Sequence, residues 1–332
     1  MKTQDIAKEI AEWYLHHHRQ LPFRETKDPY RIWISEIMAQ QTQIQQLLPY
    51  YKRWMEKWPS ILHLSQATIE EVNKIWEGLG YYSRARNILK TSQILFEQYE
   101  GQFPQIYEEI IKLPGIGPYT AGAISSIAFE QPIAAIDGNV IRVLSRWMAN
   151  ESDFSTLNNK KILTAFIEQL MKTQPPSIIT QALMEIGALV CTFRNPLCHA
   201  CPLQPTCQAF ARGQVDQFPF QKPKKAKVHE HYNVFIYIKN DSLLVSTNDQ
   251  DGLMKGLLRL PQLPIPENPF EQTVLFSKTK HVFSHKIWHL TVFEASKPLK
   301  KLPSTKFLKL SEIKNQAWIT AHKKILLDYL DE

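Results

Sequence analysis

Apolar side chains at helical spacing dominate the first two thirds of the chain. Ile6, Ile10 and Trp13 lie on one face of a predicted first helix, because side chains three or four residues apart share a face of an α-helix. The same pattern predicts further helices at residues 68–77, 83–99, 105–112, 118–128, 138–149, 158–172 and 177–190. Since the connections contain Gly or Pro and no β-hairpin pattern occurs, we expect residues 1–212 to form a mainly helical domain.

The clearest helix start is Asp28-Pro29, which combines a capping side chain with a proline in the first turn. Apolar residues at helical spacing follow, from Trp33 to Leu48. The run 30–48 is therefore predicted to be helical, although Gln40 and Gln41 make it unusually rich in amides for a buried helix.

The pattern changes after residue 212. Residues 213–229 contain two prolines and a cluster of lysines with little periodicity, which predicts a linker. Its lysines either form only a solvated tether or also contact phosphates. Beyond it, residues 232–247 and 281–296 have the pattern of strands, and residues 320–330 that of a closing helix. Residues 230–332 are therefore predicted to be a small α/β or α+β domain.

Composition places the chain among globular proteins. Of its 332 residues, 44% are hydrophobic and 21% are charged, and no uninterrupted apolar run is long enough to cross a membrane. The N-terminus lacks the apolar segment of a signal peptide, so we expect a cytoplasmic location and no membrane partner. The net charge of +7 lies wholly in residues 221–332, which hold 18 Lys and Arg against 11 Asp and Glu. Bulk charge therefore gives no sign that residues 1–220 bind nucleic acid.

All four cysteines fall in one 17-residue window, at Cys191, Cys198, Cys201 and Cys207. Disulfides would link distant segments, and a cytoplasmic protein keeps its thiols reduced, so the cluster indicates a metal site. Four thiolates suit either tetrahedral zinc or a 4Fe–4S cluster, and the spacing leaves both open. His199 is a rival ligand in the same loop, but four cysteines already complete the set.

Residues 107–128 combine two helices with the tight turn LPGIG. Gly115 and Gly117 allow the chain to turn sharply and to approach a partner closely, and Pro118 suits the first turn of the second helix. The free backbone N–H groups at the start of that helix are a ready site for a phosphate. This pattern favours a helix–hairpin–helix that binds the DNA backbone over a purely structural corner between helices.

Two carboxylates are candidates for acid–base chemistry. Glu36 follows the apolar residues Ile32 and Trp33 on one helix face, which favours a raised pKa and the role of a general acid. Asp137 immediately precedes an amphipathic helix. Taken alone, Glu36 is equally a surface side chain of its helix, and Asp137 is equally a helix N-cap.

Together these segments resemble the adenine DNA glycosylase (MutY) family of the helix–hairpin–helix superfamily. The resemblance covers nearly the whole chain through LPFR (21–24), DPYRIWISEIMAQQT (28–42), GLGYYSRARN (78–87), LPGIGPYTAGAI (113–124), DGNVIRVLSR (137–146), the four-cysteine loop (191–207), FPFQKPK in the linker and VFSHKIWHL (282–290). It implies a helical catalytic domain at residues 1–212 that carries one 4Fe–4S cluster on the four cysteines.

The resemblance also implies a function, namely the removal of adenine opposite 8-oxoguanine or guanine in double-stranded DNA, and we expect a monomer. Glu36 would protonate the departing adenine and Asp137 would stabilise the sugar cation, as in a retaining glycosidase. Tyr119 stands where bifunctional relatives have a Schiff-base lysine, which implies a glycosylase without strand cleavage. The residues expected to contact the base or the DNA are Gln41, Tyr119, Asn139, Gln181 and Arg19, with Gly115 and Gly117 in the hairpin.

Residues 230–332 resemble the family's Nudix-like domain for recognition of 8-oxoguanine. Ser284 and His285 match the loop that reads the damaged base, although a strand end with incidental polar residues would have the same pattern. No two adjacent glutamates follow Arg212, so the metal-binding motif of a working Nudix hydrolase is missing.

Two other functions remain open. One is an endonuclease III-like glycosylase for another mismatched or oxidised base, against which Glu36 argues because those relatives lack it. The other is a non-catalytic iron–sulfur protein that binds DNA, against which Glu36 and Asp137 argue together.

Overall fold

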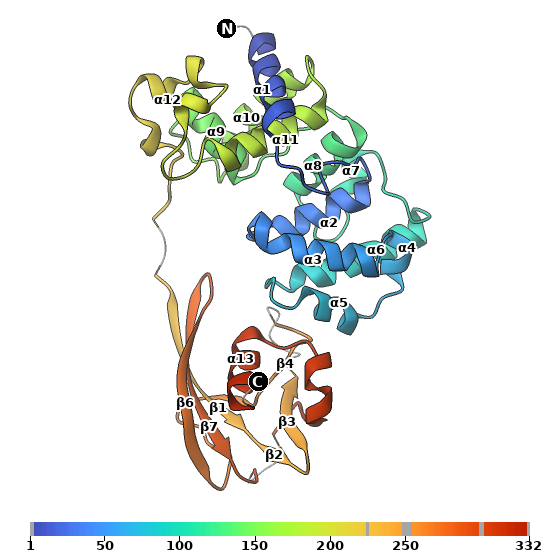
Figure 1. The fold of residues 1–332 in the computed structure, drawn as a ribbon, viewed down its shortest axis with the longest axis vertical. Helices are drawn as coiled ribbons and strands as arrows, with labels where there is room; N and C mark the ends of the chain where they lie inside the picture. Colours follow the sequence, from blue (N-terminus) through green and yellow to red (C-terminus); the bar gives the residue numbers. More distant parts are fainter. Residues whose placement is uncertain (1–2, 224–225, 248–253, 299–301, 331–332) are drawn as a thin grey trace. The chain divides into compact units, whose positions relative to one another are not determined.

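The computed structural model describes residues 3–223, 226–247, 254–298 and 302–330, which fall into two compact units (Figure 1). The first unit comprises Met1–Ser65 and Lys90–Lys222, and the second unit comprises Gln66–Leu89 and Pro223–Glu332. The boundary after Lys222 falls inside the predicted linker, of which residues 224 and 225 lie outside the described residues. Residues 66–89, which we expected in the helical domain, instead pack within the second unit.

Helices build the first unit, and no strand occurs in the described residues up to 223. Apart from the run 30–48, every helix predicted for residues 1–212 is present, although the one at 68–77 lies in the second unit and the one at 105–112 is reduced to the short α7. None of the described helices is both long and apolar enough to cross a membrane. The helices are α1 (Thr3–His17), α2 (Pro29–Ala39), α3 (Ile44–Lys57), α4 (Ile61–Ser65), α6 (Ser83–Gln98, which begins in the second unit), α7 (Tyr107–Ile110), α8 (Pro118–Phe129), α9 (Gly138–Met148), α10 (Leu157–Met171), α11 (Pro176–Leu189) and α12 (Gln208–Ala211).

The predicted helical run 30–48 is broken in the structure. Asp28 caps α2 as expected, since its side chain accepts a hydrogen bond from the Tyr30 N–H at 2.9 Å. However, α2 ends at Ala39, Gln41 adopts the left-handed conformation with φ 58°, and α3 begins only at Ile44. The residues between the two helices are amides and a threonine, so no apolar side chain there holds a further helical turn against the core.

The helices α2 and α8 form the centre of the first unit. Residues 32–38 of α2 and residues 120–127 of α8 are buried without a break, which is the pattern of helices covered on all sides. Small side chains allow close packing here, because a Cβ added to Gly122 would lie 2.6 Å from the carbonyl oxygen of Ala134. This central region nevertheless contains the carboxyl group of Glu36.

The second unit contains two four-stranded sheets, so the C-terminal region is α+β. The first sheet has the order β5-β1-β7-β6, with β1 and β7 parallel and the other pairs antiparallel. The second sheet is built on β3, which pairs with β2, β4 and β8. The strands are β1 (Val228–Ile236), β2 (Ile238–Lys239), β3 (Ser242–Thr247), β4 (Leu258–Arg259), β5 (Gln262–Pro264), β6 (Thr273–Val282), β7 (Lys286–Ala295) and β8 (Thr305–Lys309).

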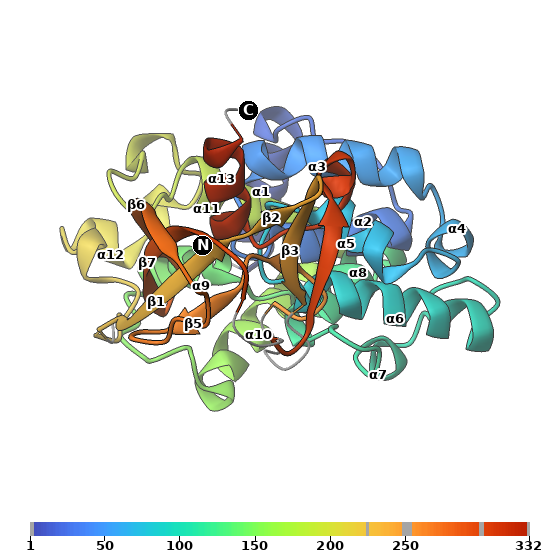
Figure 2. The ribbon, with the colours of Figure 1, turned by 90° about the horizontal axis from the view of Figure 1, so that it is seen from below.

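The strands predicted within residues 232–247 and 281–296 and the closing helix are present in the structure. Asn240 and Asp241, both with positive φ, form the tight turn between β2 and β3. Helix α13 (Thr320–Tyr329) lies between the sheet of β1 and strand β3 (Figure 2). Its His322 is fully buried, accepts a hydrogen bond from the Leu260 N–H, and contacts the ring of Trp288 edge-on. Burial lowers the pKa of His322 to about 3, so this histidine is a neutral core residue.

Residues 66–89 pack against the last part of the chain. Helix α5 (Ile69–Trp76) starts with a capping box in which Thr68 and Glu71 exchange hydrogen bonds. Its buried face includes Val72 and Trp76. Glu77, which ends α5, pairs with Lys323 of α13 at 2.7 Å. These contacts are the physical reason that the segment belongs to the second unit.

Candidate active site

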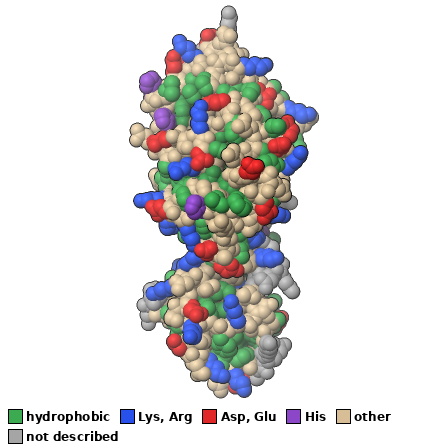
Figure 3. All heavy atoms as spheres, turned by 90° about the vertical axis from the view of Figure 1, so that its right-hand side faces the viewer, with side chains coloured by type: hydrophobic (Ala, Val, Ile, Leu, Met, Phe, Trp, Pro, Cys, Tyr) green, Lys and Arg blue, Asp and Glu red, His purple; other side chains and the backbone are tan. Residues whose placement is uncertain are grey.

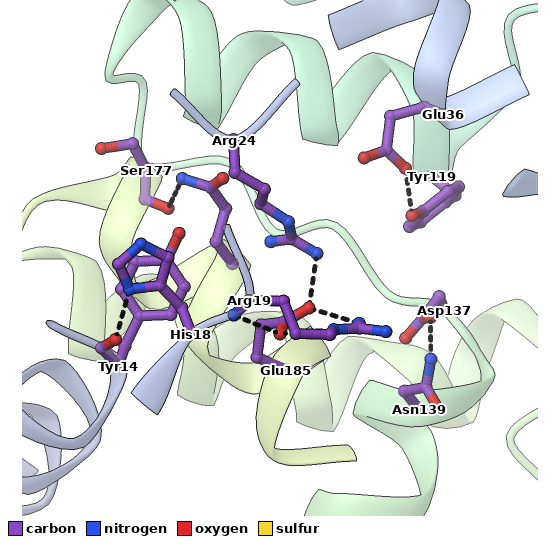
Figure 4. Close-up of polar contacts among 11 residues, drawn as sticks. Tyr14, His18, Arg19, Arg24, Glu36, Tyr119, Asp137, Asn139, Ser177 and Glu185 are labelled. Carbon is purple, nitrogen blue, oxygen red and sulfur yellow. Dashed lines mark hydrogen bonds and ion pairs between the residues drawn. The ribbon is translucent and has the colours of Figure 1, made fainter. Parts of the chain in front are cut away.

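One cavity in the first unit collects most of the predicted catalytic residues. It has a volume of about 860 Å³ and is lined by α2, the loop 40–45, the first residues of α8 and α9, and part of α11. Figure 4 shows Glu36 paired with Tyr119, and Asp137 paired with Asn139. The predicted residues that line this cavity are Arg19, Glu36, Gln41, Tyr119, Asp137 and Asn139.

Glu36 is almost fully buried, with 9% of its surface exposed. The Tyr119 hydroxyl donates a hydrogen bond to its Oε2 atom. Burial raises the pKa of Glu36, while the hydrogen bond from Tyr119 and the charge of Arg24 oppose the rise. Burial also holds the pKa of Tyr119 well above its usual range, so the phenol remains a donor. Glu36 therefore keeps its proton to higher pH than a free glutamate does, as a general acid requires.

Asp137 is both the N-cap of α9 and part of the cavity wall. Its Oδ1 accepts a hydrogen bond from the Val140 N–H at 2.7 Å, and its Oδ2 accepts one from Asn139 Nδ2 at 2.9 Å. Burial raises the pKa of Asp137, and these hydrogen bonds lower it. The capping interpretation and the catalytic interpretation are therefore compatible, because the cap holds the carboxylate in place.

A buried carboxylate beside the cavity pairs with two arginines. Arg19 donates to both oxygens of Glu185, at 2.9 and 2.6 Å, and Arg24 Nη2 donates to Oε1 at 3.1 Å (Figure 4). Burial would raise the pKa of Glu185, but its bonds to these arginines outweigh that effect and lower it. Arg24 lines the cavity, and its buried Nη1 has no hydrogen-bond partner. The sequence motif LPFR contained Arg24, yet nothing local marked it as a site residue.

Three predicted contact residues do not line this cavity. Gln181 is buried in α11, where its Nε2 donates to the Ser177 carbonyl at 3.1 Å and its Oε1 has no hydrogen-bond partner. Gly115 and Gly117 form the hairpin turn before α8, as predicted. Gly115 has φ 77°, so its conformation favours glycine. Gly117 has ordinary extended backbone, and a Cβ there would meet no atom within 4 Å.

Two arginines of α9 connect this cavity with the cysteine loop. Arg142 donates to Asn139 Oδ1 and to the carbonyl of Cys191, both at 2.7 Å. Arg146 is buried and donates to four backbone carbonyls within residues 192–218, and its Nη1 lies 3.5 Å from Cys191 Sγ. Because Asn139 holds Asp137, the cysteine loop and the Asp137 carboxylate share one supporting helix. Sequence reasoning missed both arginines.

The four cysteines line one small cavity of about 20 Å³. Among the residues that the structure describes, no three His, Cys, Asp or Glu side chains are placed to hold a metal ion. A single zinc ion needs its sulfur ligands about 3.8 Å apart, given Zn–S bonds of about 2.3 Å. A cluster of four irons places its thiolate ligands further apart. His199 does not line this cavity, and its ring contacts Phe210 edge-on.

A second cavity, of about 310 Å³, lies within the second unit. The exposed residues Ser284 and His285 line it from the loop between β6 and β7, and residues 78–82 also line it. Strand β1 holds the β6–β7 loop in place, because the Val228 N–H at the start of β1 donates a hydrogen bond to the His285 carbonyl at 3.1 Å. Both residues predicted to read a damaged base therefore lie in one cavity, together with the GLGYY segment.

Known proteins similar to this chain are DNA glycosylases. The family model of HhH-GPD superfamily base excision DNA repair proteins matches residues 34–172. The adenine DNA glycosylase of Buchnera aphidicola from Baizongia pistaciae is 38% identical over 305 residues, covering 88% of this chain and 85% of its own. The adenine DNA glycosylase of Rattus norvegicus is 31% identical over 403 residues, covering 98% and 78%. The solved structure of a thermostable thymine-DNA glycosylase is similar with a TM-score of 0.57 and 25% identity, over 63% of this chain and 97% of its own.

Because the pKa of Glu36 is raised, we expect this residue to lower the free energy of unfolding at high pH. Protonation of a carboxyl whose pKa is raised on folding stabilises the folded state at low pH, and this stabilisation is lost as pH rises through the folded pKa. We expect Glu36→Gln to raise the free energy of unfolding at pH 8, because ionisation of the buried carboxyl costs free energy that a neutral amide does not. The gain should shrink towards pH 5. Urea denaturation across this range measures it, with the exposed Glu97→Gln as control, and equal stability of Glu36→Gln and parent at every pH would contradict the burial argument.

Proposed function

Because the chain belongs to the adenine DNA glycosylase family, we propose that it removes adenine from mispairs in double-stranded DNA by hydrolysing the N-glycosidic bond, as a step of base excision repair. The observation that carries the proposal is the pair of carboxyl groups in one cavity, Glu36 with a raised pKa and Asp137 held by hydrogen bonds. A cavity of about 860 Å³ has room for a base that has left the duplex stack, which this chemistry requires.

Adenine leaves poorly as an anion, so its departure needs a proton. Glu36 gives its proton to N7 of adenine, the bond between N9 and C1′ breaks, and neutral adenine departs with the bonding electrons. The raised pKa keeps Glu36 in its acid form before this step. Tyr119 occupies Oε2 of Glu36 as a donor, which leaves Oε1 for the transfer.

Departure of the base leaves positive charge on C1′ of the sugar. Asp137 accepts hydrogen bonds at both oxygens, whereas Glu36 accepts a side-chain hydrogen bond from one phenol. Burial raises the pKa of both carboxyl groups, but Asp137 accepts more hydrogen bonds that favour its anion, so we assign the anion to Asp137 and the acid to Glu36, a division of roles typical of paired carboxyl groups. Asp137 stabilises the cation or bonds to it, and a water molecule that gives its proton to Glu36 completes the hydrolysis.

A hydrogen-bond donor of Arg24 that lacks a partner favours adenine as the bound base. Arg24 lines the cavity, and its Nη1 is a buried donor without a partner, a situation that costs roughly 1–3 kcal/mol. The ring nitrogens of adenine that do not carry hydrogen are acceptors and would satisfy this donor. The tyrosine at position 119 cannot form a Schiff base with the sugar, so we propose excision without strand cleavage.

Two features support contact with duplex DNA. Gln41 is exposed at the left-handed turn between α2 and α3, where its side chain can enter the space that an extruded adenine leaves. The N-terminus of α8, behind Gly117, offers free N–H groups to a backbone phosphate. Acidic and basic side chains are interspersed on the face shown in Figure 3.

Single-turnover excision tests the proposal. The parent should release adenine from duplexes with A opposite 8-oxoguanine or G, and Glu36→Gln and Asp137→Asn should each lose at least roughly 10²-fold in rate while still binding the DNA. Glu97→Gln serves as the matched control. Release of thymine glycol and not adenine would favour the endonuclease III-like alternative. A near-parental excision rate for Glu36→Gln would show that Glu36 is not part of the mechanism.

We also propose that the four cysteines hold one 4Fe–4S cluster. The four thiols surround a common space, and the donor set, with the Arg146 guanidinium beside Cys191, suits a cluster of net negative charge. When bound, the cluster closes the loop 191–207, whose own side chains are largely exposed or half-buried. Arg142 and Arg146 then place the start of α9 relative to this loop.

Metal analysis tests this assignment. Anaerobically purified protein should be brown and contain about four irons per chain. Cys198→Ser should lose most of the iron because a ligand is missing, and His199→Ala should keep it. One zinc and no iron per chain would overturn the assignment, and iron loss on His199→Ala would make this histidine a ligand.

We infer that the second unit, as a Nudix-like domain, distinguishes 8-oxoguanine from guanine opposite the adenine. Ser284 offers a hydroxyl and His285 a ring nitrogen at the cavity of the second unit. 8-Oxoguanine differs from guanine by a hydrogen on N7 and an oxygen on C8, and such polar groups can recognise both features.

Excision opposite the two bases tests this inference. The double variant Ser284→Ala with His285→Ala should show a markedly smaller preference for A opposite 8-oxoguanine over A opposite G, because the polar contacts to N7 and C8 are lost. Thr279→Ala, on the exposed part of β6, is the control. Both substrates must be compared at the same salt concentration, since phosphate contacts make affinity salt-dependent. Equal losses on both substrates would make the loop a general DNA contact.

A further inference from the structure

Glu77 connects two walls of the cavity in the second unit. It ends α5 and directly precedes Gly78, the first residue of the cavity-lining segment 78–82. Its Oε1 accepts a hydrogen bond from the Trp318 N–H at 3.0 Å, and Trp318 directly precedes Ile319 and Thr320, which also line the cavity. One carboxylate thus lies next to both walls without lining the cavity itself.

The contacts of Glu77 are strong ones. Its Oε2 pairs with Lys323 at 2.7 Å and with Lys74 at 3.3 Å, and only 11% of its side chain is exposed. Lys74 donates in turn to the carbonyl of Gln316 at 2.9 Å. Charge-assisted hydrogen bonds in such partly buried places are stronger than neutral ones and fix geometry. The end of α5 is therefore tied to residues 316–323 at several points.

The segment that follows Glu77 is rigid within itself. Trp76 Nε1 donates to the Gly80 carbonyl at 2.9 Å, and Arg84 Nη2 donates to the carbonyls of Leu79 and Gly80 at 3.0 and 3.1 Å. Gly78, Gly80 and Tyr81 all have positive φ, so the segment has a defined and unusual backbone path. A rigid segment attached to α5 moves with α5, so its distance from Ile319 and Thr320 is set by the contacts that hold the end of α5 to residues 316–323.

We propose that Glu77 is a positioning residue for recognition of the damaged base: it fixes the distance between segment 78–82 and the cavity wall that carries Thr320. The inference rests on the proposed function of the second unit. It predicts that loss of the Glu77 contacts loosens this cavity and leaves Glu36 and Asp137, which belong to the first unit, as they are.

Two variants of Glu77 and two readouts test the proposal in the full-length protein. Glu77→Gln keeps an acceptor for the Trp318 N–H but loses the charge that pairs with Lys323, and Glu77→Ala loses both. The preference for A opposite 8-oxoguanine over A opposite G should fall roughly tenfold in Glu77→Ala and less in Glu77→Gln, with excision opposite G changed less than twofold. Glu70→Gln, an exposed acid in the first turn of α5, should change neither rate.

Amide hydrogen exchange provides a readout that does not depend on excision. Exchange of residues 78–82 and 317–320 should become faster in Glu77→Ala, in Glu77→Gln and in Lys323→Met, and the double variant of Glu77→Gln with Lys323→Met should add little to either single one. Unchanged exchange and an unchanged preference in Glu77→Ala would overturn the proposal. A parent without any preference for 8-oxoguanine would instead refute the proposed function of the second unit, while the exchange data would still decide whether Glu77 ties the walls together.

Discussion

Burying a carboxyl group inside a helical core costs free energy, and the first unit has such a carboxyl group, Glu36, at its centre. Glu36 lies in a stretch of α2 that is buried from residue 32 to residue 38, and α8 packs against it with small side chains. The side chain that donates a hydrogen bond to Glu36 is itself a weak acid, Tyr119, and the charge of Arg24 only partly opposes the rise in pKa that burial causes. A stability optimum would place an apolar residue there. The arrangement instead favours a protonated carboxyl at the wall of a cavity, which is what the proposed chemistry uses.

The helical part of the fold follows from local patterns, and so it could be predicted from the sequence. Apolar spacing located the helices, and Asp28 and Asp137 were recognised as possible caps because capping needs only neighbouring residues. The break at Gln41 was missed, since amides are compatible with a helix until no apolar partner holds the turn. Residues 66–89 were placed with the helical domain because an amphipathic helix shows which face is buried but not which part of the chain covers it.

At the candidate site too, local patterns found residues in motifs but not contacts between distant parts of the chain. Glu36, Tyr119, Asp137 and Asn139 were found through motifs, and the structure brings them into one cavity. Arg24 could not be identified, because its partner Glu185 lies far away in the sequence. Gln181 was expected in the base pocket, yet on α11 the cavity is lined by Met184 and Ala188, and Gln181 lies one turn nearer the start of the helix, where it bonds to Ser177. Arg142 and Arg146 are ordinary members of an amphipathic pattern until the cysteine loop folds against them.

The interruption of the first unit by residues 66–89 has a consequence for synthesis. A chain leaves the ribosome from its N-terminus, and the two halves of the first unit, up to Lys222, can pack as soon as both have emerged. Helix α5 is made early, but Trp318 and Lys323, which bond to Glu77 at its end, are made last. During synthesis, the residues that form the cavity of Glu36 and Asp137 therefore emerge before Trp318 and Lys323, the partners of Glu77 at the end of α5. A chain released before α13 would retain the cavity of Glu36 and Asp137 and would expose α5 to the binding of chaperones and to proteolysis.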